Sequence, residues 1–158
     1  MLLFVHVALS LVGLATGFVV IWGMYNARPL DRWTAVFLAT TLLTSLTGFL
    51  FPIHGFTPGI GLGIISLPVL GLAIFARYGR HLAGPWRKVF VITAVVAQYL
   101  NFFVLIVQSF MKIPALHDLA PNQSEPPFAI AQAVALVAFV ALGILATIKF
   151  RASTALKP

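Results

Sequence analysis

The side chains best able to do chemistry in this sequence are amides and histidines placed in long apolar stretches. Gln98, Asn101 and Gln108 share a stretch without Asp, Glu, Lys or Arg. At 100° per residue these three positions fall within about 80° of one another on a helix. An amide in hydrocarbon that lacks hydrogen-bond partners costs several kcal/mol, so this face must meet protein or water. The spacing predicts a polar helix face turned into a bundle.

Other polar residues are expected at matching depths on the neighbouring helices. The levels of Gln98 and Asn101 are matched by Thr40, Thr41 and Thr44. The level of Gln108, nearer the outside, is matched by Thr47, His6 and Gln132. These positions predict a polar pocket that opens to the outside, with the ligand-binding residues Asn101, Gln98, Gln108, His6, Thr44 and Gln132. The alternative is a set of interhelical hydrogen bonds that only hold the bundle together, each contributing about 0.6 kcal/mol.

Three histidines are expected on the same side as that pocket. His6, His54 and His117 could ligate copper or zinc, or two of them could ligate a b-type haem. No HxxxH or HxxH spacing supports such a site, and His81 stands alone on the opposite side. The competing interpretation is that these histidines are interfacial or hydrogen-bonded.

The sequence lacks the usual motifs of enzymes. It has no GxSxG, no HExxH and no phosphate-binding glycine loop, and it has no cysteine for thiolate or disulfide chemistry. No carboxylate lies within a long apolar stretch, so His6 is the one titratable group at depth that proton-coupled transport could use. These absences favour a protein that is not an enzyme.

The elements that must position these residues follow from composition. Hydrophobic residues make up 61% of the 158-residue chain and charged residues only 8%, which predicts an integral membrane protein. The charge-free stretches predict a single transmembrane domain, residues 1–158, with an all-α fold and five transmembrane helices. The expected spans are residues 2–25, 33–51, 60–78, 89–111 and 128–148.

The charged residues between these spans predict the orientation. One face would carry nine basic residues against Asp31: Arg28, Arg32, Arg77, Arg80, Arg87, Lys88, Lys149, Arg151 and Lys157. The other face would carry Lys112, Asp118 and Glu125. Because basic loops stay in the cytoplasm, the N-terminus is expected outside and the C-terminus inside. Topology and anionic lipid therefore account for the net charge of +7 without nucleic acid.

Small residues and one long loop predict further contacts. Gly59 with Gly63, and Ala131 with Ala135, have the spacing of close helix contacts, either within the chain or with a partner or second copy. The loop at 112–127 contains four prolines and several apolar residues, which predicts an ordered lid. Glu125 is expected to favour the N-terminus of the last helix.

Two segments carry a resemblance to known proteins. The run RYGRHLAGPWR at 77–87 and the segment APNQSEPPF at 120–128 resemble those of small, uncharacterised inner-membrane proteins of proteobacteria. That resemblance implies a location in the bacterial cytoplasmic membrane and brings no activity with it. The order of spans and the basic loop around His81 are also faintly similar to b561-like membrane cytochromes, although no ligand residue transfers.

The sequence therefore predicts a non-enzymatic binding or accessory subunit for a lipid, a quinone or another small amphiphile. One alternative is an electron-transfer protein with haem b or copper on the three histidines. A second alternative is a small transporter or channel subunit.

Overall fold

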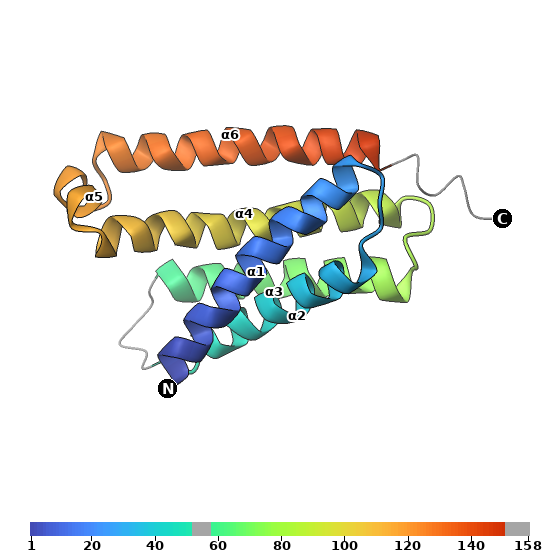
Figure 1. The fold of residues 1–158 in the computed structure, drawn as a ribbon, viewed down its shortest axis with the longest axis horizontal. Helices are drawn as coiled ribbons and strands as arrows, with labels where there is room; N and C mark the ends of the chain where they lie inside the picture. Colours follow the sequence, from blue (N-terminus) through green and yellow to red (C-terminus); the bar gives the residue numbers. More distant parts are fainter. Residues whose placement is uncertain (52–57, 151–158) are drawn as a thin grey trace.

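The computed structural model describes residues 1–51 and 58–150, and its helices follow the charge-free stretches of the sequence (Figure 1). The elements are α1 (Leu2–Tyr25), α2 (Asp31–Gly48), α3 (Pro58–Ile74), the π-helical turn η1 (Phe75–Gly79), α4 (Trp86–Lys112), α5 (Pro114–Leu119) and α6 (Pro126–Lys149). Each of the five predicted spans corresponds to one long helix, and α3 and η1 together form the third. The described residues contain no strand, so the all-α class is confirmed.

Within residues 1–51 and 58–150, four helices are long and apolar enough to cross a membrane. They are α1, the continuous helix Gly59–Gly79, α4 and α6. By their length and composition, these four helices are typical of an integral membrane protein. The second helix, α2, is shorter and begins with the charged pair Asp31 and Arg32, and hydroxyl residues recur along it. Its crossing of the membrane stays a prediction.

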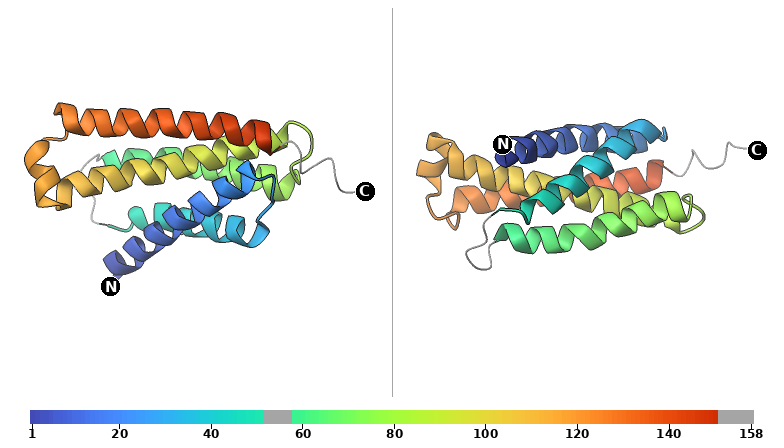
Figure 2. Two further views of the ribbon diagram at one scale, coloured as in Figure 1. Left: turned by 45° about the horizontal axis from the view of Figure 1, so that its top comes forward. Right: turned by 90° about the horizontal axis from the view of Figure 1, so that it is seen from below.

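Four of the helices form a bundle, and α6 lies against its outside. In this bundle α1 packs against α2 and α4, and α3 also packs against α2 and α4. The last helix, α6, runs along α4 and touches α1, as the views in Figures 1 and 2 agree. The short helix α5 packs on α4 where the chain turns towards α6. Polar faces of α1, α2 and α4 are thereby brought together.

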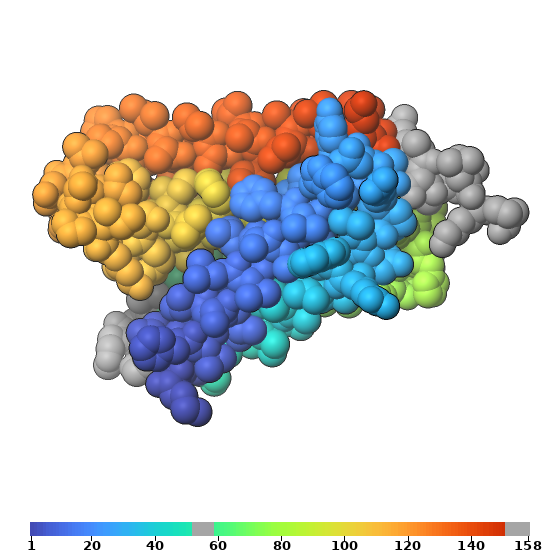
Figure 3. Space-filling view, in the orientation of Figure 1, coloured from blue at the N-terminus to red at the C-terminus, as the bar shows by residue number. Residues whose placement is uncertain are grey.

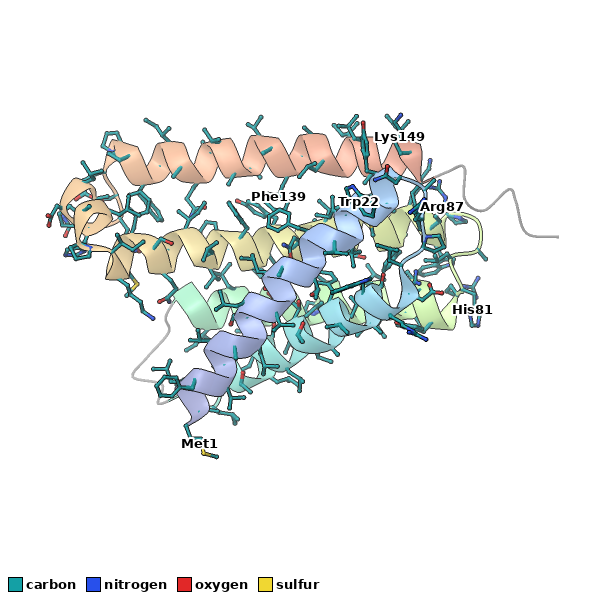
Figure 4. All side chains as sticks on the ribbon, viewed as in Figure 1. Met1, Trp22, His81, Arg87, Phe139 and Lys149 are labelled. Carbon is teal, nitrogen blue, oxygen red and sulfur yellow. The ribbon has the colours of Figure 1, made fainter. Side chains whose placement is uncertain are left out.

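The two ends of the bundle differ in charge. Trp22, His81, Arg87 and Lys149 lie at one end, which we call the basic end, and Met1 lies at the opposite end (Figure 4). Aromatic side chains are exposed around the basic end, on the last turn of α1 and the first turn of α2: Trp22, Tyr25 and Trp33. Such a ring of tryptophan and tyrosine is typical of a membrane–water boundary.

A buried arginine ties together three helices at the basic end. The guanidinium of Arg77, on the π turn, pairs with the Asp31 carboxylate at the start of α2. It also lies 5.2 Å from the centre of the Phe90 ring on α4. Arg77 is only 8% exposed, so these two partners compensate for the loss of its hydration.

The half of the bundle near the basic end is well packed, and the other half is not. The buried apolar cluster joins residues of all the long helices, among them Met24, Phe37, Leu70, Phe90 and Phe139. In α1 the buried positions begin at Gly13 and continue to Met24. The N-terminal half of α1 stands apart from α4 and α5, with a hollow between them (Figure 3).

Two glycines let α1 approach its neighbours closely. A methyl group at Gly13 would lie 3.1 Å from the hydroxyl oxygen of Thr41 on α2, and one at Gly17 would lie 1.9 Å from the Gln98 amide oxygen on α4. Gln98 is fully buried, and its Nε2 donates a 2.7 Å hydrogen bond to the Leu14 carbonyl. Gly13 and Gly17 therefore form the GxxxG contact that fixes α1 on the bundle.

The predicted small-residue faces also pack within the chain. A side chain at Gly63 would meet the Phe49 ring at 2.8 Å, and Ala135 is buried. Their use by a partner or a second copy stays a prediction.

We expect Gly17→Ala to lower the free energy of unfolding by about 1–3 kcal/mol, because the new methyl group must displace the buried Gln98 amide from its carbonyl partner. Unfolding by sodium dodecyl sulfate in mixed micelles, followed by circular dichroism, measures this. Gly71→Ala is the control, since no atom lies within 4 Å of the added methyl group. The same Gly17→Ala change in a Gln98→Ala background should lose most of its cost, and an equal cost in both backgrounds would contradict the assigned contact.

Candidate functional site

Two adjoining cavities occupy the loosely packed half of the bundle. The inner cavity, of about 290 Å³, lies among α1, α2, α3 and α4 and includes Thr44, Gly63 and Ser66. The lateral cavity, of about 350 Å³, lies between α1 and α4 and includes Leu3, Val7 and Lys112. The residues that line both cavities are His6, Ser10, Phe51, Asn101, Val104 and Gln108. This shared wall makes them one continuous candidate site.

His6 offers a hydrogen-bond acceptor to this site. Its Nδ1 lies 2.9 Å from the Thr47 hydroxyl oxygen, while that hydroxyl donates its own proton to the Leu43 carbonyl at 2.8 Å. When the Thr47 hydroxyl donates to Leu43, its oxygen accepts a hydrogen bond from Nδ1, and Nε2 of the neutral ring is then an acceptor. The Phe51 ring packs edge-on against the imidazole, with ring centres 5.1 Å apart. The contacts with Thr47 and Phe51 thus hold the orientation of the His6 ring.

Thr44 offers a hydroxyl to the inner cavity. One turn before it, Thr40 donates to the Val36 carbonyl at 2.7 Å, and one turn after it, Thr47 makes the equivalent bond. The Thr44 hydroxyl is buried and has no hydrogen-bond partner among the described residues. A buried polar group normally has a partner, and because this oxygen has almost no accessible surface, a small movement of the wall would be needed for a ligand or a water in the cavity to reach it.

Asn101 connects the cavity wall to the helix contact. Its side-chain amide donates a 3.1 Å hydrogen bond to the Thr41 hydroxyl on α2. The same Thr41 hydroxyl lies against Gly13, so Asn101 sits directly beside the close approach of α1 and α2. One amide N–H and the carbonyl oxygen of Asn101 remain for contacts inside the cavities.

Of the six predicted ligand-binding residues, four line a cavity and two lie in contacts between helices. His6, Asn101 and Gln108 line both cavities, and Thr44 lines the inner one. Gln98 lies instead in the α1–α4 contact, and Gln132 on α6 donates to the Phe103 carbonyl of α4 at 3.3 Å. These two glutamines hold helices together and line neither cavity.

Three serines that line the cavities, Ser10, Ser45 and Ser66, were not among the predicted ligand-binding residues. Ser10 lies one turn after His6 on the same face of α1 and donates to the His6 carbonyl at 2.7 Å. Its i, i+4 spacing from His6 was a signal that could have found it. Ser66 faces the inner cavity from α3, where it is surrounded in the sequence by apolar residues and gave no comparable signal.

The proposed metal ligands are not gathered by the described part of the chain. Among residues 1–51 and 58–150, no group of three His, Cys, Asp or Glu side chains lies close enough to hold a metal ion. His117 is exposed on α5, and His6 is bound to Thr47. His54 lies outside the described residues.

The long loop between α4 and α6 is ordered by its own hydrogen bonds. Gln123 Nε2 donates to the Val107 carbonyl of α4 at 2.9 Å. The Glu125 carboxylate accepts from the backbone N–H of Asn122 at 3.2 Å, the Asn122 side-chain amide at 2.9 Å and the backbone N–H of Ser124 at 3.1 Å. Glu125 directly precedes α6, as expected, but its side chain organises the preceding turn and makes no capping bond to the helix. The described residues that line the two cavities do not include α5.

Comparison with known proteins assigns no family or function to the chain. The chain matches no protein-family model, no curated protein and no solved structure. The function must therefore be argued from the geometry of the chain, and the resemblance to small proteobacterial membrane proteins stays an expectation.

The loop before α6 should loosen in acid. Desolvation raises the pKa of Glu125, but its hydrogen bonds outweigh this effect and hold the pKa below its ordinary value. A lowered pKa means that ionised Glu125 stabilises the folded loop above the pKa of the unfolded chain, and that this contribution is lost as pH falls through the folded value. We expect the amide protection factors of Asn122 and Ser124 to fall in hydrogen-exchange measurements as the pH is lowered below the ordinary pKa of a glutamate.

Glu125→Gln should remove this acid transition, because the glutamine amide does not titrate. Asp118→Asn removes a carboxyl group from the same loop and is the matched control. A transition that persists in Glu125→Gln would show that another group is responsible.

Proposed function

We propose that this protein is a five-span bundle of the bacterial cytoplasmic membrane, with its N-terminus outside and its C-terminus in the cytoplasm. Two arrangements support the topology. The ends of the helices alternate between the basic end and the opposite end, and the seven described basic residues of the nine-residue set belong to connections or helix ends at the basic end. Basic connections are retained in the cytoplasm.

A reporter fused to the C-terminus tests the orientation. In a bacterial expression host, we expect a C-terminal fusion to green fluorescent protein to be fluorescent. A C-terminal fusion to alkaline phosphatase should be inactive, because phosphatase folds only outside the cytoplasm. A phosphatase fusion after residue 51 is the control and should be active. The reverse pattern, or an active C-terminal phosphatase, would refute the five-span orientation.

We further propose that the bundle is a non-enzymatic binding or accessory subunit that holds the uncharged head of a small amphiphile in the inner cavity. The observation that carries this proposal is the pairing of an acceptor, His6 Nε2, with the unsatisfied Thr44 hydroxyl in one cavity system. Unpaired polar groups in a membrane interior carry a cost that a bound ligand removes.

The lining of the inner cavity favours a neutral head. Its described residues include no Asp, Glu, Lys or Arg, and an unpaired charge is very costly to place in such a site. A phosphate or carboxylate is therefore disfavoured in the inner cavity, whereas the lateral cavity has one basic lining residue, Lys112, among the described residues. A head with hydroxyl groups fits, because a hydroxyl can donate to His6 Nε2 and accept from Thr44. A hydroquinone ring and a glyceride both have this chemistry.

The lateral cavity supplies a path for the apolar chain of such a ligand. It is lined on α1 by Leu3, Val7 and Leu11, which are 54%, 39% and 54% exposed on the face that a bilayer would cover. The chain would extend between α1 and α4 into the surrounding lipid while the head remains inside. The ligand would then arrive from the membrane as well as from the outer mouth.

The proposal predicts which variants lose the ligand. With a hydroquinone carrying a decyl chain as the probe, we expect His6→Ala and Asn101→Leu each to weaken binding at least about fivefold, the cost of one lost hydrogen bond. Each residue also makes one hydrogen bond between helices, His6 to Thr47 and Asn101 to Thr41, so the fold of both variants must be checked separately. Equilibrium dialysis measures binding, and thermal unfolding checks the fold.

His81→Ala, at the basic end, is the control and should bind as the original protein does. The oxidised quinone should bind more weakly than the hydroquinone, since it has no hydroxyl to donate to Nε2. Unchanged binding in both His6→Ala and Asn101→Leu would leave only the interpretation that these residues hold the helices together.

A further inference from the structure

A second hollow lies on the outside of the bundle, far from the polar site. The α4–α6 groove has a volume of about 460 Å³ and is bordered by these two helices alone. Its wall is apolar, and the lining residues are Ile92, Val95, Val96, Tyr99, Leu136, Phe139, Val140, Gly143, Ile144, Thr147 and Ile148. Because the floor is formed by Val95 and Phe139, which are each only 5% exposed, the groove is a built concavity between two packed helices.

The groove has the length and position of one leaflet. On α6 it runs from Leu136 to Ile148, and at 1.5 Å per residue this is about 18 Å. One leaflet of a hydrocarbon core about 30 Å thick measures about 15 Å. The groove ends at Ile92 and Ile148, next to the basic end, and at Tyr99 and Leu136 towards the middle of the bundle. An acyl chain that starts at the basic surface would fill it.

Positive charge is concentrated where the groove ends. Lys88 is exposed and lies one turn before Ile92, on the same face of α4. Beside it, Arg87 is buried, and its Nη1 donates to the Thr147 carbonyl of α6 at 3.4 Å. Among the described residues at this end the acidic side chain is Asp31, which is already paired with Arg77. The field at the mouth of the groove is therefore positive.

We propose that the α4–α6 groove binds an anionic phospholipid, with one acyl chain between α4 and α6 and the phosphate at Lys88. The groove supplies the apolar contact and the basic end supplies the charge complementarity, at about a fivefold gain in affinity for each basic residue. A second copy of the chain is a poor occupant, because a symmetric contact through this face would bring the two basic ends together. The site is independent of the inner cavity.

Native mass spectrometry of the full-length protein in detergent, titrated with phosphatidylglycerol or phosphatidylethanolamine, tests the proposal. We expect the first phosphatidylglycerol to bind more tightly than phosphatidylethanolamine, and Lys88→Gln to weaken phosphatidylglycerol binding about fivefold. Arg32→Gln removes the same charge from the same end, on α2, which packs against α1 and α3, and should have little effect. Lys88 and Arg32 are both exposed, so both variants should fold.

The apolar part of the site is tested by filling it. Val140→Trp places a large ring in the groove, whereas Val137→Trp places the same ring on an exposed position of α6 that does not line it. We expect the first to lose the tightly bound phospholipid and the second to keep it. Equal binding of the two phospholipids by the original protein, an unaltered affinity in Lys88→Gln, or equal retention by the two tryptophan variants would overturn the proposal.

Discussion

The close contact between Gly17 and Gln98 is the constraint on which the rest of this architecture depends. The side chain at position 17 must be absent, because the Gln98 amide occupies its place and reaches the Leu14 carbonyl behind it. Towards the basic end of this crossing, α1 and α4 share a packed core. Beyond the crossing, α1 diverges from α4 (Figure 1), the lateral cavity lies between these two helices, and the inner cavity lies among them and α2 and α3. This one polar contact thus marks the boundary between the well-packed half of the bundle and the half that contains the cavities.

Polar residues in this apolar chain have two different roles, and their hydrogen bonds distinguish them. Hydroxyls such as Thr40 and Thr47 are satisfied by the carbonyl one turn earlier, and Gln132 is held by a carbonyl of the next helix. Such groups add stability and do not need a ligand. The Thr44 hydroxyl and the second ring nitrogen of His6, Nε2, can each make a further hydrogen bond, and both residues line a cavity. Gln98 Oε1 and Gln132 Oε1 also lack a partner, but they lie in helix contacts and line neither cavity, so the candidate site is defined by polar groups that both line a cavity and can make a further hydrogen bond.

The sequence was sufficient to predict the helices and much of the polar face, but not the division of that face. The charge-free stretches mark α1, α3, α4 and α6 because a membrane interior excludes charge, while Asp31 and the hydroxyls of α2 weaken the same signal there. Gln98 and Asn101 share a helix face and so were predicted to share a pocket. Which of them meets a helix and which meets a cavity depends on where α1 crosses α4, and that crossing depends on Gly17, whose spacing from Gly13 was not recognised as a contact. The position of His54 falls outside the described residues.

The lateral cavity determines which ligand concentration would matter for the proposed binding of an amphiphile. A site reached from the aqueous phase samples the dissolved ligand, which for a long-chain amphiphile is scarce. A site that opens between α1 and α4 samples the leaflet itself, so its occupancy follows the mole fraction of the amphiphile among the lipids. Diffusion in two dimensions then delivers the ligand, and a weak intrinsic affinity is sufficient for high occupancy. A change in the lipid composition of the membrane would then change the fraction of bundles that hold the amphiphile.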